Sequence, residues 1–163
     1  LLLMGDLFNF FFTGAKVCEF SNATTTQFYN PRTSDWARTL LDRVGLPHHF
    51  LPEIIEPATH IGHLTGTISE ELGIQPVPFI APATHDTGSA VAAVPTEDAD
   101  YAYISSGTWS LMGTEINAPI LSENALAHNF TNEGGVGRTY RFLKNIMGLW
   151  LVILFTSMTN FEK

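Results

Sequence analysis

The sequence has little cysteine and little positive charge. A single cysteine, Cys18, occurs in 163 residues, which excludes an internal disulfide and any zinc site built from several cysteines. We therefore expect a reducing compartment, the cytoplasm. Eight Lys and Arg residues stand against sixteen Asp and Glu residues, so the formal net charge is −8. This balance argues against nucleic acid or an anionic membrane surface as a partner and favours a small molecule.

Apolar runs long enough to cross a membrane are also lacking. The apolar start of the chain is interrupted by Asp6 and Asn9, and the run from Gly148 to Phe155 is far shorter than the roughly 20 residues that a spanning helix needs. The apolar content of 45% suffices for one ordinary hydrophobic core. The chain begins with Leu1 rather than Met, and we expect it to be an internal fragment of a longer protein.

One stretch, residues 78–94, combines strand and helix signals around a single carboxylate. An apolar run typical of a buried strand ends in a proline-containing turn, and an alanine-rich segment follows. Asp86 is therefore expected in the first turn of a helix, where free N–H groups and the helix dipole stabilise an anion. Such a carboxylate can act as a general base. Equally, Asp86 or Thr84 can be a plain N-cap, and this stretch alone favours the cap.

The residues before this stretch predict a mainly helical region. Apolar spacing indicates helices at 3–12, 34–44 and 65–72, each followed closely by a glycine. We expect much of the first helix to be buried, and Ser34 or Asp35 to cap the second. The Thr-rich segment 16–29 could line a cleft, but its composition favours a solvated loop.

Four of the six histidines lie close together in the sequence, at His48, His49, His60 and His63. The spacing of His60 and His63 could chelate a metal, but no cysteine or acidic third ligand stands at a recognised distance. We interpret them as solvated loop histidines and predict no metal site.

The pattern changes after a short acidic turn at 95–100, which we interpret as a domain boundary. Two β-rich runs at 101–105 and 109–115 are joined by Ser106, Gly107 and Thr108, which predicts a hairpin. Small hydroxyl residues and a glycine in such a turn are suited to holding phosphate oxygens, although glycine-containing hairpin turns are common.

The remaining segment predicts a turn, a strand and a helix. The glycine-rich run 132–137 fits neither the dinucleotide nor the P-loop template and is expected to be a flexible turn. Residues 138–145 alternate Tyr140 and Phe142 with other side chains, which indicates a strand that ends at Asn145 before a helix beginning near Met147. Asn145 is either a ligand-binding residue or a turn former. These features describe an α/β chain with a cleft between two units, one supplying a base and the other holding phosphate.

Four motifs follow one another along the chain: 22–27 (NATTTQ), 83–87 (ATHDT), 105–111 (SSGTWSL), and 129–137 running into 144–150. In this order they resemble the FGGY carbohydrate kinases, members of the actin-like, ribonuclease-H-like ATPase superfamily. The resemblance covers about residues 3–152. It implies part of a two-domain α/β sugar kinase, with 1–95 from the sugar-binding first domain and 100–163 from the ATP-binding second domain.

The resemblance also implies chemistry and roles for individual residues. It implies ATP-dependent phosphorylation, with Mg²⁺, at the 1-hydroxyl of a ketose; the motifs are most similar to those of members acting on L-rhamnulose in rhamnose catabolism. It implies that Asp86 is the catalytic base and, with His85, Thr87 and Asn145, contacts the sugar. Gly107 and Thr108 would lie at the ATP phosphates. No metal-ligating residue is implied.

The departures from the family limit these expectations. The glycine-rich phosphate loop of the first domain and the adenine-binding part of the second are missing. After about Leu151 the sequence becomes atypical, and Ile153 stands where a nucleotide-contacting Gln is expected. We therefore expect the chain alone to be inactive. The alternatives are an FGGY kinase for another ketose or polyol, and a catalytically dead fragment that binds a sugar or a partner.

Overall fold

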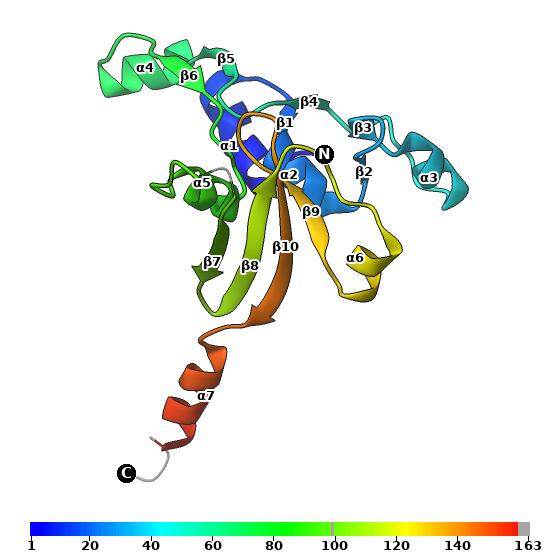
Figure 1. Ribbon diagram of the computed structural model, residues 1–163. Helices are drawn as coiled ribbons and strands as arrows, with labels where there is room; N and C mark the ends of the chain where they lie inside the picture. Colours follow the sequence, from blue (N-terminus) through cyan, green and yellow to red (C-terminus); the bar gives the residue numbers. More distant parts are fainter. Residues whose placement is uncertain (99, 160–163) are drawn as a thin grey trace.

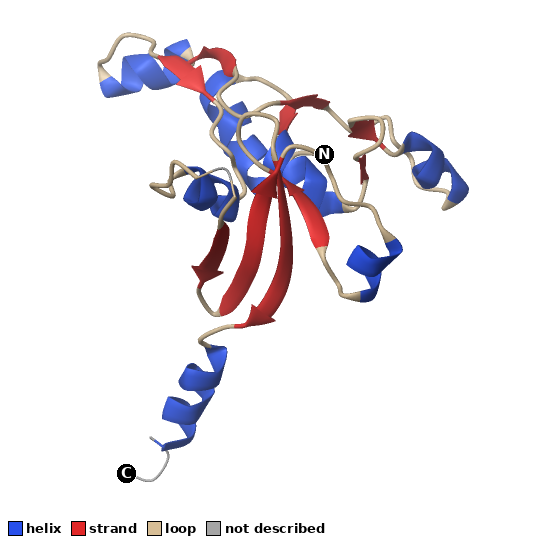
Figure 2. Cartoon of the chain, in the orientation of Figure 1, coloured by secondary structure: helices blue, strands red, loops and turns tan. Residues whose placement is uncertain are grey.

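The computed structural model of the chain describes residues 1–98 and 100–159 (Figure 1). Its helices are α1 (Met4–Thr13), α2 (Phe20–Ala23), the 3₁₀ helix η1 (Thr24–Thr26), α3 (Arg38–Arg43), α4 (Gly66–Leu72), α5 (Asp86–Ala92), α6 (Glu123–Ala127) and α7 (Trp150–Thr159). Its strands are β1 (Val17–Glu19), β2 (Tyr29–Asn30), β3 (Asp35–Trp36), β4 (Glu53–Ile55), β5 (His60–His63), β6 (Pro78–Ile80), β7 (Ala102–Ser106), β8 (Trp109–Ile116), β9 (Thr131–Gly134) and β10 (Tyr140–Met147). Helices and strands are thus mixed along the chain, as the sequence predicts (Figure 2).

A four-stranded sheet dominates the C-terminal part of the chain, residues 100–159. Its strand order is β7-β8-β10-β9, and each neighbouring pair is antiparallel. The predicted hairpin is confirmed, because β7 and β8 pair from Ala102 opposite Thr114 to Ser106 opposite Ser110. Since Asn145 lies opposite Leu111 in the β8–β10 ladder, it is at the same end of the sheet as the hairpin turn.

The other end of this sheet packs against the N-terminal part, residues 1–95 (Figure 1). The ring of Phe20 meets the rings of Tyr29 and Tyr140 edge-on, each at a centroid distance of 5.5 Å. The N–H of Gly134 donates to Thr24 Oγ1 at 2.8 Å. An apolar aromatic cluster and a buried hydrogen bond therefore fix β9 and β10 against α2 and η1.

The first helix forms where the sequence predicts it, but the prediction that it is mostly buried is wrong. Its buried residues are Asp6 and Asn9, whereas Met4, Phe8 and Phe11 are each more than half exposed. Gly14 ends the helix in the left-handed conformation, with a φ of 79°. Phe12 packs on Phe79 of β6 with ring centroids 5.5 Å apart, but most of the apolar stripe of α1 is exposed and its polar side faces inward.

The second predicted helix starts later than the sequence suggests. Asp35 and Trp36 form β3 instead, and Ala37, not Ser34 or Asp35, is the N-cap of α3. The physical reason is tertiary: Trp36 is 4% exposed and its indole donates to Pro52 O at 2.7 Å. This contact holds Trp36 in extended backbone. The helix predicted at 65–72 is confirmed as α4, which Gly73 ends at a φ of 65°.

Two segments expected to be irregular are part of the ordered structure. The Thr-rich segment 16–29 contains β1, α2, η1 and the start of β2, and its Cys18 and Ala23 form a small core with Trp36. Burial raises the pKa of the Cys18 thiol. Similarly, the glycine-rich run expected to be a flexible turn supplies β9 through Gly134. Composition misleads here because the polar side chains find hydrogen-bond partners inside the protein.

The two closely spaced histidines are exposed, as predicted, but they do not lie in a loop. His60 and His63 occupy the ends of β5, with ring centroids 5.1 Å apart.

Across residues 1–98 and 100–159, no helix is both long and apolar enough to cross a membrane.

The contact between Gly134 and Phe20 makes the junction of the two parts sensitive to one methyl group. A Cβ at position 134 would lie 2.8 Å from Phe20 Cδ1 and 3.0 Å from Phe20 O. Gly134→Ala should therefore lower the free energy of unfolding by about 1–3 kcal/mol through overpacking. Urea denaturation measures this change.

A matched control is available in α4. A Cβ at Gly66 would meet nothing within 4 Å, so Gly66→Ala should leave stability unchanged or raise it. Equal effects of the two substitutions would contradict the packing described for the junction.

Candidate functional site

A cleft of about 640 Å³ opens between the start of α5 and the hairpin end of the sheet. Five of the six residues singled out from the sequence line it, namely His85, Asp86, Thr87, Gly107 and Asn145. Ser105, Ser106, Trp109 and Leu111 complete the lining. The two parts of the chain therefore meet in one cleft. Thr108 lies in the same turn as Gly107 but is not among the lining residues.

Asp86 is the first residue of α5, and its side chain is 96% exposed. The N-cap of α5 is His85, which is in extended conformation, so neither Asp86 nor Thr84 occupies the capping position. Asp86 Oδ1 accepts a hydrogen bond from the N–H of Thr87 at 2.7 Å. The carboxylate is thus held at the helix start with access to the cleft.

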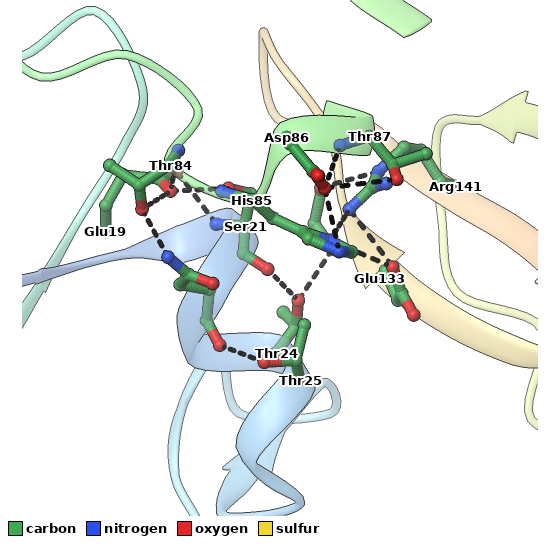
Figure 3. Close-up of polar contacts among 12 residues, drawn as sticks. Glu19, Ser21, Thr24, Thr25, Thr84, His85, Asp86, Thr87, Glu133 and Arg141 are labelled. Carbon is green, nitrogen blue, oxygen red and sulfur yellow. Dashed lines mark hydrogen bonds and ion pairs between the residues drawn. The ribbon is translucent and has the colours of Figure 1, made fainter. Parts of the chain in front are cut away.

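Next to Thr84, two residues before Asp86, lies Glu19, a carboxylate that is completely buried (Figure 3). Its Oε1 accepts from the N–H of Ser21 at 2.8 Å. Its Oε2 accepts from the N–H and the hydroxyl of Thr84, both at 2.8 Å, and from the hydroxyl of Ser21. The Ser21 oxygen in turn accepts from the N–H of His85 at 3.0 Å. This network ties the residues just before Asp86 to α2.

Two further side chains complete the buried network. Asn22 donates to Thr84 Oγ1 at 2.7 Å, and Asp6 Oδ1 accepts from the N–H of Glu19 at 2.9 Å. Burial is the main cause that raises the pKa of Asp6, the negative charge of Glu19 adds to it, and the hydrogen bond from the Glu19 N–H opposes it. Asp6 therefore keeps its proton to a higher pH than an ordinary aspartate.

On the opposite side of His85 lies Arg141, which is 0% exposed although it carries a charge. Its Nε donates to Gly134 O at 3.0 Å, and its Nη2 is 3.2 Å from Glu133 Oε2. The same Nη2 is 2.9 Å from His85 Nδ1. Burial lowers the pKa of Arg141, and the charge of Glu133 counteracts part of this shift.

Sequence reasoning missed these buried charges. The alternation in 138–145 sets Arg141 and Leu143 on the face opposite Tyr140, yet Tyr140, Arg141 and Leu143 are all buried, because this end of the sheet is covered on both faces. The available signal was an arginine placed between the aromatic residues Tyr140 and Phe142. The helix after β10 also begins later than expected, at Trp150 rather than near Met147.

Most backbone polar groups of the hairpin turn are already hydrogen-bonded within the protein. The N–H of Gly107 donates to Trp109 O at 2.9 Å, while the carbonyl of Gly107 accepts from Leu149 at 2.9 Å and that of Thr108 from Trp150 at 3.3 Å. These bonds link the turn to the start of α7. The exposed Thr108 is therefore better able than the Gly107 N–H to offer donors to a phosphate.

The Glu19 network makes a prediction about stability. A Gln at position 19 keeps one carbonyl oxygen and turns an NH₂ group toward donors, so buried donors lose their acceptor. Glu19→Gln should lower the free energy of unfolding by about 3 kcal/mol. Glu53→Gln, at an exposed position of β4, should change it by less than about 0.5 kcal/mol. Equal urea midpoints for the two variants would show that the network does not stabilise the fold.

Two family models match the chain one after the other. The N-terminal domain of the FGGY family of carbohydrate kinases matches residues 1–93, and the C-terminal domain of this family matches residues 102–163. Curated relatives agree. The rhamnulokinase of Oceanobacillus iheyensis is 51% identical over 151 residues, which make up 93% of this chain and 32% of the relative. The rhamnulokinase of Pectobacterium atrosepticum is 50% identical, over 93% of this chain and 30% of the relative.

The chain thus spans about a third of the length of the curated relatives it matches. Solved structures share its fold at lower identity. A xyloylose kinase from Brucella ovis superposes with a TM-score of 0.78 at 17% identity, covering 95% of this chain and 32% of that chain. The ligand-bound xylulose kinase of Lactobacillus acidophilus has a TM-score of 0.69 at 21% identity, covering 88% and 29%. The predicted α/β fold is confirmed, since these sugar kinases share it. The chain belongs to the FGGY family of carbohydrate kinases.

Proposed function

We propose that this chain is the part of a sugar kinase that carries the catalytic carboxylate, Asp86. The complete protein would transfer the γ-phosphoryl group of ATP to the 1-hydroxyl of L-rhamnulose, a step of rhamnose catabolism. The observation that carries the proposal is the exposed Asp86 carboxylate in a cleft that both parts of the chain line. The choice of sugar rests on the identity of about half of all aligned residues with rhamnulokinases.

The proposal assigns each part of the chain to one domain. Residues 1–95 would be the last part of the first, sugar-binding domain, and residues 100–163 the first part of the second, ATP-binding domain. The ranges of the two family models, 1–93 and 102–163, support this division. In this arrangement the cleft lies where sugar and nucleotide must meet.

The chemistry suits a single accessible carboxylate. Phosphoryl transfer depends mainly on positioning the reactants and neutralising charge, and it needs a base to accept the proton of the attacking hydroxyl. Asp86 suffices as this base because the proton leaves late, when the hydroxyl has become acidic. His85, Thr87 and Asn145 would hold the sugar, and Gly107 and Thr108 would lie next to the phosphates.

Mg²⁺ fits the cleft as a companion of ATP. Among the described residues, no group of three or more His, Cys, Asp or Glu side chains could hold a metal ion, and the carboxylate among the lining residues is Asp86. Mg²⁺ commonly keeps several waters and binds through one or two carboxylates and the substrate phosphates. Asp86 is needed as the base, so the ATP phosphates and water would supply the ligands of Mg²⁺. When bound, Mg²⁺ neutralises charge on the phosphates.

The proposal is best tested in a complete kinase. We would build a chimaera in which the 151 matched residues of this chain replace the corresponding segment of the Oceanobacillus iheyensis rhamnulokinase. Turnover of L-rhamnulose above that of other ketoses and polyols is expected. A preference for another sugar would instead support a different FGGY kinase.

In this chimaera, Asp86→Asn should lower kcat by about 100-fold to 10,000-fold while sugar binding is largely kept, because it removes the general base but little volume. Steady-state kinetics and calorimetry with the sugar measure the two effects. Asp42→Asn is the matched control, since Asp42 lies in α3 with a side chain 65% exposed; it should leave kcat unchanged. Near-normal turnover of Asp86→Asn would refute the assignment of the base.

The chain of 163 residues by itself should show no ATP-dependent phosphorylation of rhamnulose, because the segments proposed to complete the ATP site are not in it. A coupled assay for ADP release checks this. Measurable turnover would overturn the proposed division of the ATP site, and tight rhamnulose binding without nucleotide would favour a sugar-binding role.

A further inference from the structure

One buried charge, that of Arg141, has no role in the chemistry proposed for Asp86. Arg141 on β10 is fully buried, and burying a guanidinium is costly unless it is paired and hydrogen-bonded. Its ion pair with Glu133 balances the charge. The same nitrogen that faces Glu133, Nη2, also lies 2.9 Å from Nδ1 of His85, so Arg141 reaches the residue directly before Asp86.

The hydrogen-bonding chemistry of this contact favours one tautomer of His85. A guanidinium has only donors, so Nδ1 of His85 must be the acceptor, and the proton of the neutral ring is then on Nε2. Glu133 Oε2 lies 3.2 Å from the same Nδ1. It makes no hydrogen bond with any described residue, so it does not compete as an acceptor for a proton on Nδ1. Glu133 thus balances the positive charge of Arg141, and Arg141 determines which ring nitrogen of His85 carries the proton.

The other ring nitrogen faces the site. Nε2 of His85 lies 3.6 Å from Asp86 Oδ1, and His85 lines the cleft with Asp86. Figure 3 shows dashed lines from the imidazole to Asp86 and to the Arg141–Glu133 pair. A proton on Nε2 is thus directed to the side where the carboxylate lies and a sugar hydroxyl would bind.

We propose that Arg141 is a positioning residue that holds His85 as the Nε2–H tautomer, so that His85 offers a donor toward Asp86 and the sugar. This inference rests on the function proposed for Asp86. Arg141 belongs to the C-terminal part and His85 to the N-terminal part. The Nε2–H donor of His85 is therefore fixed only when the two parts are packed together.

The tautomer can be measured without any substitution that endangers the fold. We would label the histidines of the chimaera with ¹⁵N and record the long-range ¹⁵N–¹H spectrum of the imidazoles, with His85→Ala to assign the signals. The expected result is a protonated Nε2 and an unprotonated Nδ1 for His85. A protonated Nδ1 would overturn the proposal. Glu133→Gln keeps the Arg141 donor and should keep the same tautomer.

A double-mutant cycle tests whether Arg141 acts through His85. Arg141→Met alone should lower kcat by about 100-fold with little change in KM, as expected when a catalytic arrangement is displaced. On a His85→Ala background the same change should lower kcat by less than about 3-fold, because the group it positions is gone. Losses that multiply in the double variant would show an independent structural role and overturn the proposal.

Two controls separate this result from other failures. Arg38→Met removes an exposed arginine that pairs with Asp35, and it should leave kcat unchanged. The unmodified chimaera reports on the proposed function itself: if it does not phosphorylate sugar, that function fails, while the tautomer of His85 still decides the role of Arg141.

Discussion

The site depends on the hydrogen bonds that the buried carboxylate of Glu19 accepts. A buried carboxylate is tolerated when donors replace its lost water, and Glu19 receives four hydrogen bonds from Ser21 and Thr84. These bonds join α2 to the loop that enters α5. Asp86 can therefore be almost fully exposed and still be fixed in space, because the residues before it are anchored in the interior.

His85 is the point where the anchors of the two parts meet. Its N–H donates to the Ser21 hydroxyl oxygen, which belongs to the Glu19 network, and its Nδ1 faces Arg141. The backbone of His85 is thus held from the N-terminal part and its ring from the C-terminal part. These contacts restrict the orientation of His85, and Asp86 follows it directly in the chain.

Sequence reasoning predicted the features of the site that depend on neighbours along the chain. The helix start at Asp86, the hairpin at Gly107 and Thr108, and the strand that carries Asn145 follow from local patterns of apolar and turn residues. It could not predict the burial of Glu19 or Arg141, because a charge is buried only where distant residues supply its partners. Nor could it predict the exposure of α1, since periodicity shows which residues are apolar and not what covers them.

The segment 16–29 shows why polar composition is a poor guide at such a junction. The hydroxyls of Thr24 and Thr26 donate to backbone carbonyls three residues earlier, at 2.9 Å and 2.7 Å. They therefore provide hydrogen-bond donors for the carbonyl groups of their own helical turn. Thr24 Oγ1 then accepts the N–H of Gly134 from the other part. Apolar contact alone tolerates small shifts, whereas a hydrogen bond is directional. A cleft lined from both parts of the chain needs that directional restraint, and threonines supply it where leucines would not.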